Sequence, residues 1–145
     1  MNVVDSCGWL EYFADGPNAD FYAPAIEDVK NLIVPAICIL EVFKRVLQQR
    51  NEDAALQAIA LMHQGLIVDL TSNIALDAAK IRTQLKLPLA DSVILATART
   101  YSAVIWTQDE DFKGFKDVRY IERKTKGLRQ RAISITGYIN TANKI

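Results

Sequence analysis

Short apolar runs alternate with longer helical segments along most of the chain, and no other feature of the sequence limits the fold as much. The runs predict five buried strands, at 3–4, 32–34, 66–68, 104–106 and 118–121. The segments between them predict helices at about 6–14, 20–30, 36–50, 52–64, 72–86 and 89–101. Strands that alternate with helix pairs form a mostly parallel sheet with helices on both faces. The sequence therefore predicts an α/β fold, a three-layer α/β/α sandwich around about five strands.

Composition indicates one domain that needs neither disulfides nor zinc. The chain has 145 residues, and half of them are apolar, which is enough to bury a core. Its two cysteines and one histidine are too few for a disulfide framework or a histidine-based metal site. The longest apolar run, 32–40, contains Pro35 and is much shorter than the roughly 20 residues of a membrane helix. With no basic secretory start, the sequence predicts a cytoplasmic protein without a membrane span.

Several acidic residues follow predicted strands or stand early in predicted helices. Asp5 follows the first strand directly, Asp109 and Asp111 follow the fourth, and Glu41 and Asp91 stand in helices. Ligand sites of parallel sheets lie at the carboxyl ends of the strands, where these acids would meet. Carboxylates held together require a compensating cation, and oxygen ligands alone favour Mg²⁺ or Mn²⁺. Such a cation can activate water and neutralise the charge of a phosphodiester.

Each acid also has an ordinary structural interpretation. Asp5 and Asp91 could cap the starts of helices, because a carboxylate accepts hydrogen bonds from the first free N–H groups. Glu41 lies four residues before Arg45 and could form a weak surface ion pair. The two acids after the fourth strand could be turn residues. The spacing alone leaves both interpretations open.

The backbone after the fourth strand decides which side chains share a face. If it stays extended, Thr107, Asp109 and Asp111 lie on one side and Glu110 on the other. The sequence therefore predicts that these three residues face the same region.

Formal net charge is zero, but the charges are unevenly placed. Residues 1–30 hold six acids and one base, whereas residues 113–131 hold eight bases and two acids. A basic segment in a neutral protein can contact a polyanion, and it can also be a plain solvated tail. The chain reads as a core over about 1–121 followed by a basic C-terminal segment, 122–145, of unassigned role.

Four segments, in order and at suitable distances, carry a resemblance to a known family. They are Val3-Val4-Asp5-Ser6 with 9–13, Leu40-Glu41-Val42, 89–98 around Asp91, and 106–112 with its acids. Together they resemble the PIN-domain family, and most closely the VapC-type toxins of type II toxin–antitoxin systems. The resemblance implies a PIN-like α/β/α fold and a metal-dependent endoribonuclease that leaves a 5′-phosphate and a 3′-hydroxyl.

The resemblance also assigns roles by position. It implies that catalysis and Mg²⁺ or Mn²⁺ binding rest on four acids, with a fifth acid and two hydroxyl residues beside them. The four are Asp5, Glu41, Asp91 and Asp109, the further metal residue is Asp111, and the supporting hydroxyls are Ser6 and Thr107. Of Asp109 and Asp111, Asp109 is preferred as the nearer ligand. Beyond the matched region, the candidate RNA contacts are Arg123, Lys124 and Arg129.

Partners follow from the same resemblance. It implies an RNA substrate, a homodimer and a tight complex with a cognate antitoxin protein. Apolar residues in the first helix are a candidate docking groove for an antitoxin helix, or else ordinary core residues: Trp9, Leu10, Tyr12 and Phe13.

Two alternatives to a nuclease are open. A catalytically silent PIN-like module could bind RNA or protein on the same fold. A receiver-like phospho-acceptor domain also has acids at strand ends, and Asp69 follows the third strand. A receiver needs a second acid beside Asp5, where this chain has Ser6-Cys7, so the receiver alternative is the weaker.

Overall fold

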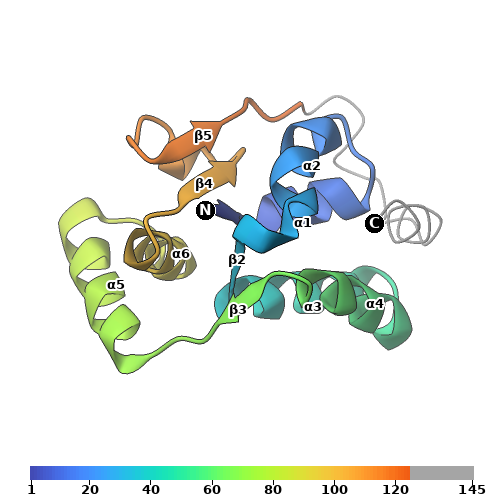
Figure 1. Cartoon of the computed structure of the whole chain (residues 1–145), viewed down its shortest axis with the longest axis horizontal. Helices are drawn as coiled ribbons and strands as arrows, with labels where there is room; N and C mark the ends of the chain where they lie inside the picture. The colour runs from blue at the N-terminus through green and yellow to red at the C-terminus, as the bar shows by residue number, and fades with distance from the viewer. Residues whose placement is uncertain (125–145) are drawn as a thin grey trace.

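A computed structural model describes residues 1–124, which form a five-stranded sheet with helices on both faces (Figure 1). The strands are β1 (Asn2–Val4), β2 (Leu32–Pro35), β3 (Leu66–Val68), β4 (Val104–Thr107) and β5 (Val118–Tyr120). The helices are α1 (Ser6–Phe13), α2 (Ala19–Glu27), α3 (Ala36–Gln49), α4 (Glu52–Met62), α5 (Ser72–Leu85) and α6 (Leu89–Thr100). Two short 3₁₀ turns, η1 (Val29–Asn31) and η2 (Glu110–Phe112), complete the described chain.

The sheet has the order β3-β2-β1-β4-β5, and every neighbouring pair is parallel. Figure 1 shows α1 to α4 on one side of the sheet and α5 and α6 on the other. This division follows from right-handed crossovers, because the chain first steps from β1 towards β3 and then returns to β4. The predicted α/β/α sandwich is confirmed, and the sheet is wholly parallel.

Element bounds differ from the predicted ones by few residues, except at the end of α2. The helix predicted to reach residue 30 ends at Glu27, because Asp28 adopts a non-helical ψ of 69° and the chain starts the separate turn η1. Helix α4 begins where the sequence predicts, since the Asn51 side chain accepts a hydrogen bond from the Ala54 N–H at 2.8 Å. No helix in residues 1–124 is long and apolar enough to span a membrane.

The core lies on both faces of β1, β2 and β4, whose apolar side chains are almost fully buried except for the half-buried Val104. Trp9 of α1 and Tyr22 of α2 are fully buried on one face. Close packing there requires Gly8, because a Cβ at this position would lie 2.5 Å from the Tyr22 ring. Helix α1 is thereby held directly above the end of β1, where the first acid stands.

Candidate metal centre

The candidate site lies at the carboxyl ends of β1 and β4, the two central neighbours. The chain leaves β1 in one direction across the sheet and enters β4 from the other, so the strand order reverses between them. Parallel sheets form a crevice outside the strand ends at such a switch point. Asp5 directly follows β1, and its N–H still continues the ladder to the Trp106 carbonyl at 3.1 Å.

Both carboxylate oxygens of Asp5 are held by the chain. Oδ1 accepts from the Ser6 N–H at 2.7 Å, so Asp5 does cap α1. Oδ2 accepts from the Thr107 hydroxyl at 2.8 Å and from the Cys7 thiol at 3.4 Å. Burial raises the pKa of Asp5, and the hydrogen bonds from Thr107 and Cys7 oppose that rise.

Thr107 connects two of the acids. Its hydroxyl donates to Asp5 and accepts from the Asp109 N–H at 2.9 Å. The Asp109 side chain in turn accepts from the Asp111 N–H at 2.9 Å and caps the turn η2. The extended backbone therefore ends at Asp109. The alternation expected of an extended chain therefore does not continue to Asp111, because the 3₁₀ turn η2 redirects the chain there.

Asp91 comes from the opposite side of the sheet, on α6. It is the third residue of that helix and makes no capping bond; Pro88 occupies the cap position. The side chain is 8% exposed. Burial, and then the charges of Asp5 and Asp109, raise its pKa to about 8.

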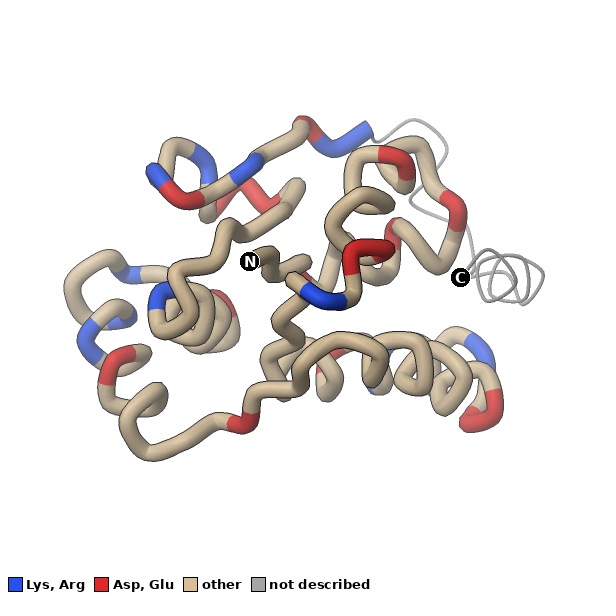
Figure 2. Tube along the Cα trace, in the orientation of Figure 1, with Lys and Arg blue, Asp and Glu red and all other residues tan. Residues whose placement is uncertain are grey.

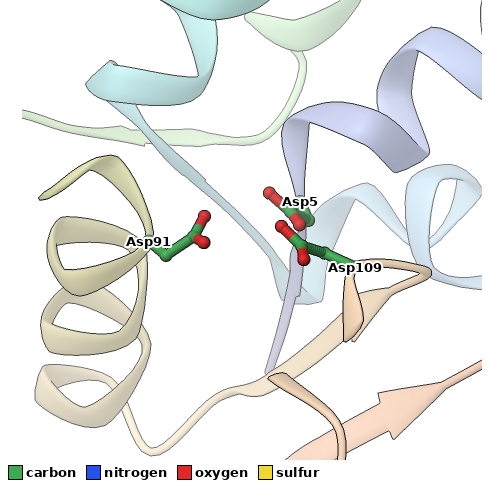
Figure 3. Close-up of side chains that lie close together, drawn as sticks. All are labelled: Asp5, Asp91 and Asp109. Atoms are coloured by element: carbon green, nitrogen blue, oxygen red, sulfur yellow. The ribbon is translucent and has the colours of Figure 1, made fainter. Parts of the chain in front are cut away.

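Figure 3 shows the carboxylates of Asp5, Asp91 and Asp109 pointing towards one another from three separate segments. One oxygen from each lies within 4.8 Å of the other two. No lysine or arginine forms an ion pair with them, since the one ion pair found within residues 1–124 joins Lys113 to Glu122. Three acids without a cationic partner, two of them buried, are a donor set that fits a hard divalent cation.

Glu41 stands beside this group and outside it. Its Oε1 accepts from the Ser6 hydroxyl at 2.7 Å, and Ser6 follows Asp5 in the chain. In the described structure the partner of Glu41 is thus Ser6 and not Arg45. Asp111 is exposed and also lies outside the three-acid group.

Two polar contacts at the site are not predicted from the sequence. The Cys7 thiol donates to Asp5. Burial and the charge of Asp5 raise the pKa of Cys7, so it stays protonated. Gln108, between Thr107 and Asp109, is buried and accepts from the Asn18 amide at 3.0 Å. Cys7 could have been suspected from its place two residues after Asp5, whereas Asn18 lies 90 residues from Gln108 in sequence.

The other predicted residues are not members of the three-acid group. Arg123 and Lys124 are exposed just after β5, and Arg129 lies outside the described residues. In the first helix, Trp9, Tyr12 and Phe13 are core residues, and only Leu10 is partly exposed. These three are therefore not an open groove. Asp69 does follow β3, as the receiver alternative requires, but it is exposed and is not part of the three-acid group.

Comparison with protein families gives one match, to a model described as "PIN domain", over residues 3–118. The matched range contains the three convergent acids with Glu41 and Asp111, and it runs from the second residue of β1 to the first residue of β5. A comparison with curated proteins gives no match.

Solved structures similar to this chain include toxins of toxin–antitoxin pairs. A toxin–antitoxin complex from Klebsiella pneumoniae is similar at 22% identity and a TM-score of 0.72, covering 85% of this chain and all of the other. FitAcB from Neisseria gonorrhoeae is similar at 21% identity and a TM-score of 0.65, covering 84% of this chain and 97% of the other. VapC20 from Mycobacterium tuberculosis is titled a Sarcin-Ricin loop cleaving toxin. It is similar at 16% identity and a TM-score of 0.64, covering 82% of this chain and 99% of the other. At these identities the likeness concerns the fold.

Proposed function

Because this chain belongs to the PIN domain family, we propose that it is a metal-dependent endoribonuclease and the toxin of a toxin–antitoxin pair. The observation that carries the proposal is the convergence of Asp5, Asp91 and Asp109 at the switch point of the sheet, with no ion pair from any lysine or arginine of the described chain. Carboxylates held close together destabilise a fold, because their negative charges repel one another. A bound hard cation offsets this repulsion, and carboxylate oxygens are the ligands that such a cation prefers.

The residues that would hold Mg²⁺ or Mn²⁺ are the three convergent acids. Glu41 and Asp111 are near enough to affect the charge of Asp91, so they would contribute to the field around the cation. When bound, the cation supplies charge neutralisation at a phosphodiester and activation of a water molecule.

The chain's own contribution is to fix the orientation of these acids. Thr107 and Cys7 donate to one oxygen of Asp5, so the direction of its free lone pairs is set before any cation arrives. Ser6 similarly orients Glu41. Preorganised ligands of this kind bind a cation without the cost of ordering the side chains at the moment of binding.

RNA is the proposed substrate. Exposed basic side chains follow β5, at the same edge of the sheet that carries the acids. Of these, Arg123 and Lys124 are the proposed RNA contacts within the described chain. Arg129 is proposed with them on charge alone. The VapC20 likeness supports a nuclease substrate, because that toxin is titled as cleaving the Sarcin-Ricin loop.

A cognate antitoxin and a second copy of the chain are the proposed protein partners. The similar structure from Klebsiella pneumoniae supports the antitoxin, since it is titled a toxin–antitoxin complex. The homodimer rests on the family resemblance alone.

The test is the substitution Asp91→Asn in the full chain, with Asp69→Asn as the matched control. Asp69 is an exposed aspartate after β3 that lies outside the three-acid group. We expect Asp91→Asn to lower the rate of Mg²⁺-dependent RNA cleavage on the order of 100-fold, the scale for losing one charge-stabilising group. Asp69→Asn should cleave as the wild type does.

Cleavage is measured on purified protein with and without a chelator, and growth is measured during expression without a partner. Wild type should arrest growth and Asp91→Asn should not. Equal cleavage by wild type and Asp91→Asn, or cleavage that survives the chelator, would contradict the assignment of the acids. A wild type that neither cleaves RNA nor slows growth would favour the catalytically silent binding module.

A further inference from the structure

A buried asparagine outside the acid group joins three distant segments of the chain. Asn18 stands just before α2 and is 2% exposed. Its Nδ2 donates to Gln108 Oε1 at 3.0 Å and to the Glu122 carbonyl at 3.0 Å. Its own N–H donates to Glu11 Oε1 at 2.9 Å, which fixes the loop that presents the side chain.

The bond to Gln108 reaches the backbone that presents Asp109. Along this extended stretch the side chains alternate, so Thr107 points to Asp5 while Gln108 points away, to Asn18. Gln108 is 4% exposed, so no bulk water competes for its amide. Holding Gln108 therefore fixes the rotation of the segment and the direction in which Asp109 leaves it.

The chemistry of this position requires a side chain with two donors. Both partners of Asn18 Nδ2 are acceptors, one an amide oxygen and one a backbone carbonyl. An NH₂ group supplies both bonds, whereas a carboxylate of the same shape supplies neither. The Asn18 Oδ1 atom is buried and has no hydrogen-bond partner among residues 1–124, and a buried acceptor left in this way costs stability. A residue kept at such a cost is better explained by what it positions than by stability alone.

We propose that Asn18 is a positioning residue of the candidate metal centre, acting through Gln108 on Asp109. The inference rests on the proposed function, because it takes the three-acid group to be the metal-binding site. It assigns no contact between Asn18 and RNA or cation.

The test is calorimetric titration of the full chain with Mn²⁺, comparing wild type with Asn18→Leu. Leucine has a similar size, keeps the backbone bonds and removes both side-chain donors. We expect Mn²⁺ to bind about tenfold more weakly, the scale for losing a residue that orients a ligand from outside. Gln108→Leu should weaken Mn²⁺ binding similarly. The double variant should have the same affinity for Mn²⁺ as the single variant with the lower affinity, because both substitutions break the hydrogen bond between Asn18 and Gln108.

Asn31→Leu is the matched control. Asn31 also donates twice from its amide, to the two oxygens of Asp28, but it lies in η1 at the amino end of β2, the opposite edge of the sheet. Free energies of unfolding are measured by denaturant titration on every variant. A residue that only stabilises the fold would change those energies and leave the affinity for Mn²⁺ unchanged.

Wild-type affinity in Asn18→Leu or in Gln108→Leu would overturn the inference and leave the proposed function standing. Wild type that binds no Mn²⁺ would overturn the metal part of the proposed function and the inference with it. If Asn18→Leu does not fold, Gln108→Leu alone decides, since it breaks the same bond from the other end.

Discussion

At the scale of single residues, Asp5 shows that a helix cap and a metal ligand are compatible assignments. Its Oδ1 accepts from the Ser6 N–H as a cap, while its Oδ2 faces Thr107 and the other acids. A carboxylate has about four lone-pair positions, so the cap leaves acceptor capacity for a cation. The two interpretations that the sequence leaves open are therefore not exclusive at this residue.

Asp91 makes binding of a divalent cation dependent on pH. With a pKa raised to about 8 by burial and neighbouring acids, its carboxyl holds a proton at pH 6 or 7 that a cation must displace. We expect the affinity for Mn²⁺ to rise with pH by up to about tenfold per unit and to level off above pH 8. Calorimetric titrations at pH 6, 7, 8 and 9 measure this change.

The same proton sets the sign of the pH effect on stability of the metal-free protein. Between the unfolded value of 3.8 and about 8, the folded state holds more protons on Asp91 than the unfolded state. The free energy of unfolding should therefore fall as pH rises through this range. Asp91→Asn serves as the control, because it has no carboxyl to titrate.

For the prediction on cation binding, an affinity of wild type for Mn²⁺ that does not change from pH 6 to pH 9 would contradict the assignment of Asp91 to the metal centre.

At the scale of elements, the 3₁₀ turn η2 separates Asp109, the acid preferred as the nearer ligand, from Asp111. Asp109 ends the extended stretch after β4 and caps the turn, so it stays beside Asp5. Asp111 lies inside the turn and faces solvent. The hydrogen bond from the Asp111 N–H to the Asp109 carboxylate holds this turn, in which Asp109 is a candidate ligand and Asp111 is a surface residue.

Helix α4 offers a prediction about local capping. Asn51→Ala removes the acceptor for the Ala54 N–H and should lower the free energy of unfolding by about 1 kcal/mol, the usual cost of losing an N-cap. Asn51→Ser keeps an oxygen at the cap and should retain most of that energy. Both are measured by denaturant titration. An alanine variant as stable as the serine variant would show that α4 gains little from its cap.

At the scale of the whole molecule, a formally neutral chain separates its charges. Figure 2 shows basic residues around β5, interleaved with acidic ones, and at the end of the described chain; several acidic residues lie on α1, α2 and the loops beside them. Arg119 lies over the Trp106 ring with its guanidinium carbon 4.8 Å from the ring centre. Such a distribution favours approach of a polyanion from the β5 side.

The double substitution Arg123→Gln with Lys124→Gln tests this approach. If both bases contact phosphates, the slope of log affinity against log salt for single-stranded RNA should become shallower by about 1.4. Binding is measured in the Asp91→Asn background, so that the RNA is not cleaved during the experiment. Lys30→Gln with Arg99→Gln removes the same charge at the opposite edge of the sheet, where both residues are exposed. Equal slopes for the two double variants would mean that residues 123 and 124 do not contact RNA.

The sequence by itself determined the elements of this protein and the set of acids to consider. Hydrophobic periodicity is local, so the five strands, the six helices and the parallel sheet could be predicted from short stretches of chain. The positions of Asp5 and Asp109 after β1 and β4 also followed, because the carboxyl ends of parallel strands share one edge.

Only the tertiary structure decided which side chains meet. The turn after Asp109 excludes Asp111 from the three-acid group, Ser6 holds Glu41 beside it, and Asn18 reaches Gln108 across 90 residues. Each outcome depends on a rotation of the backbone or on a hydrogen bond between distant segments. Sequence periodicity reports which face of its own element a residue occupies, but it carries no information about the partner that another element brings to that face.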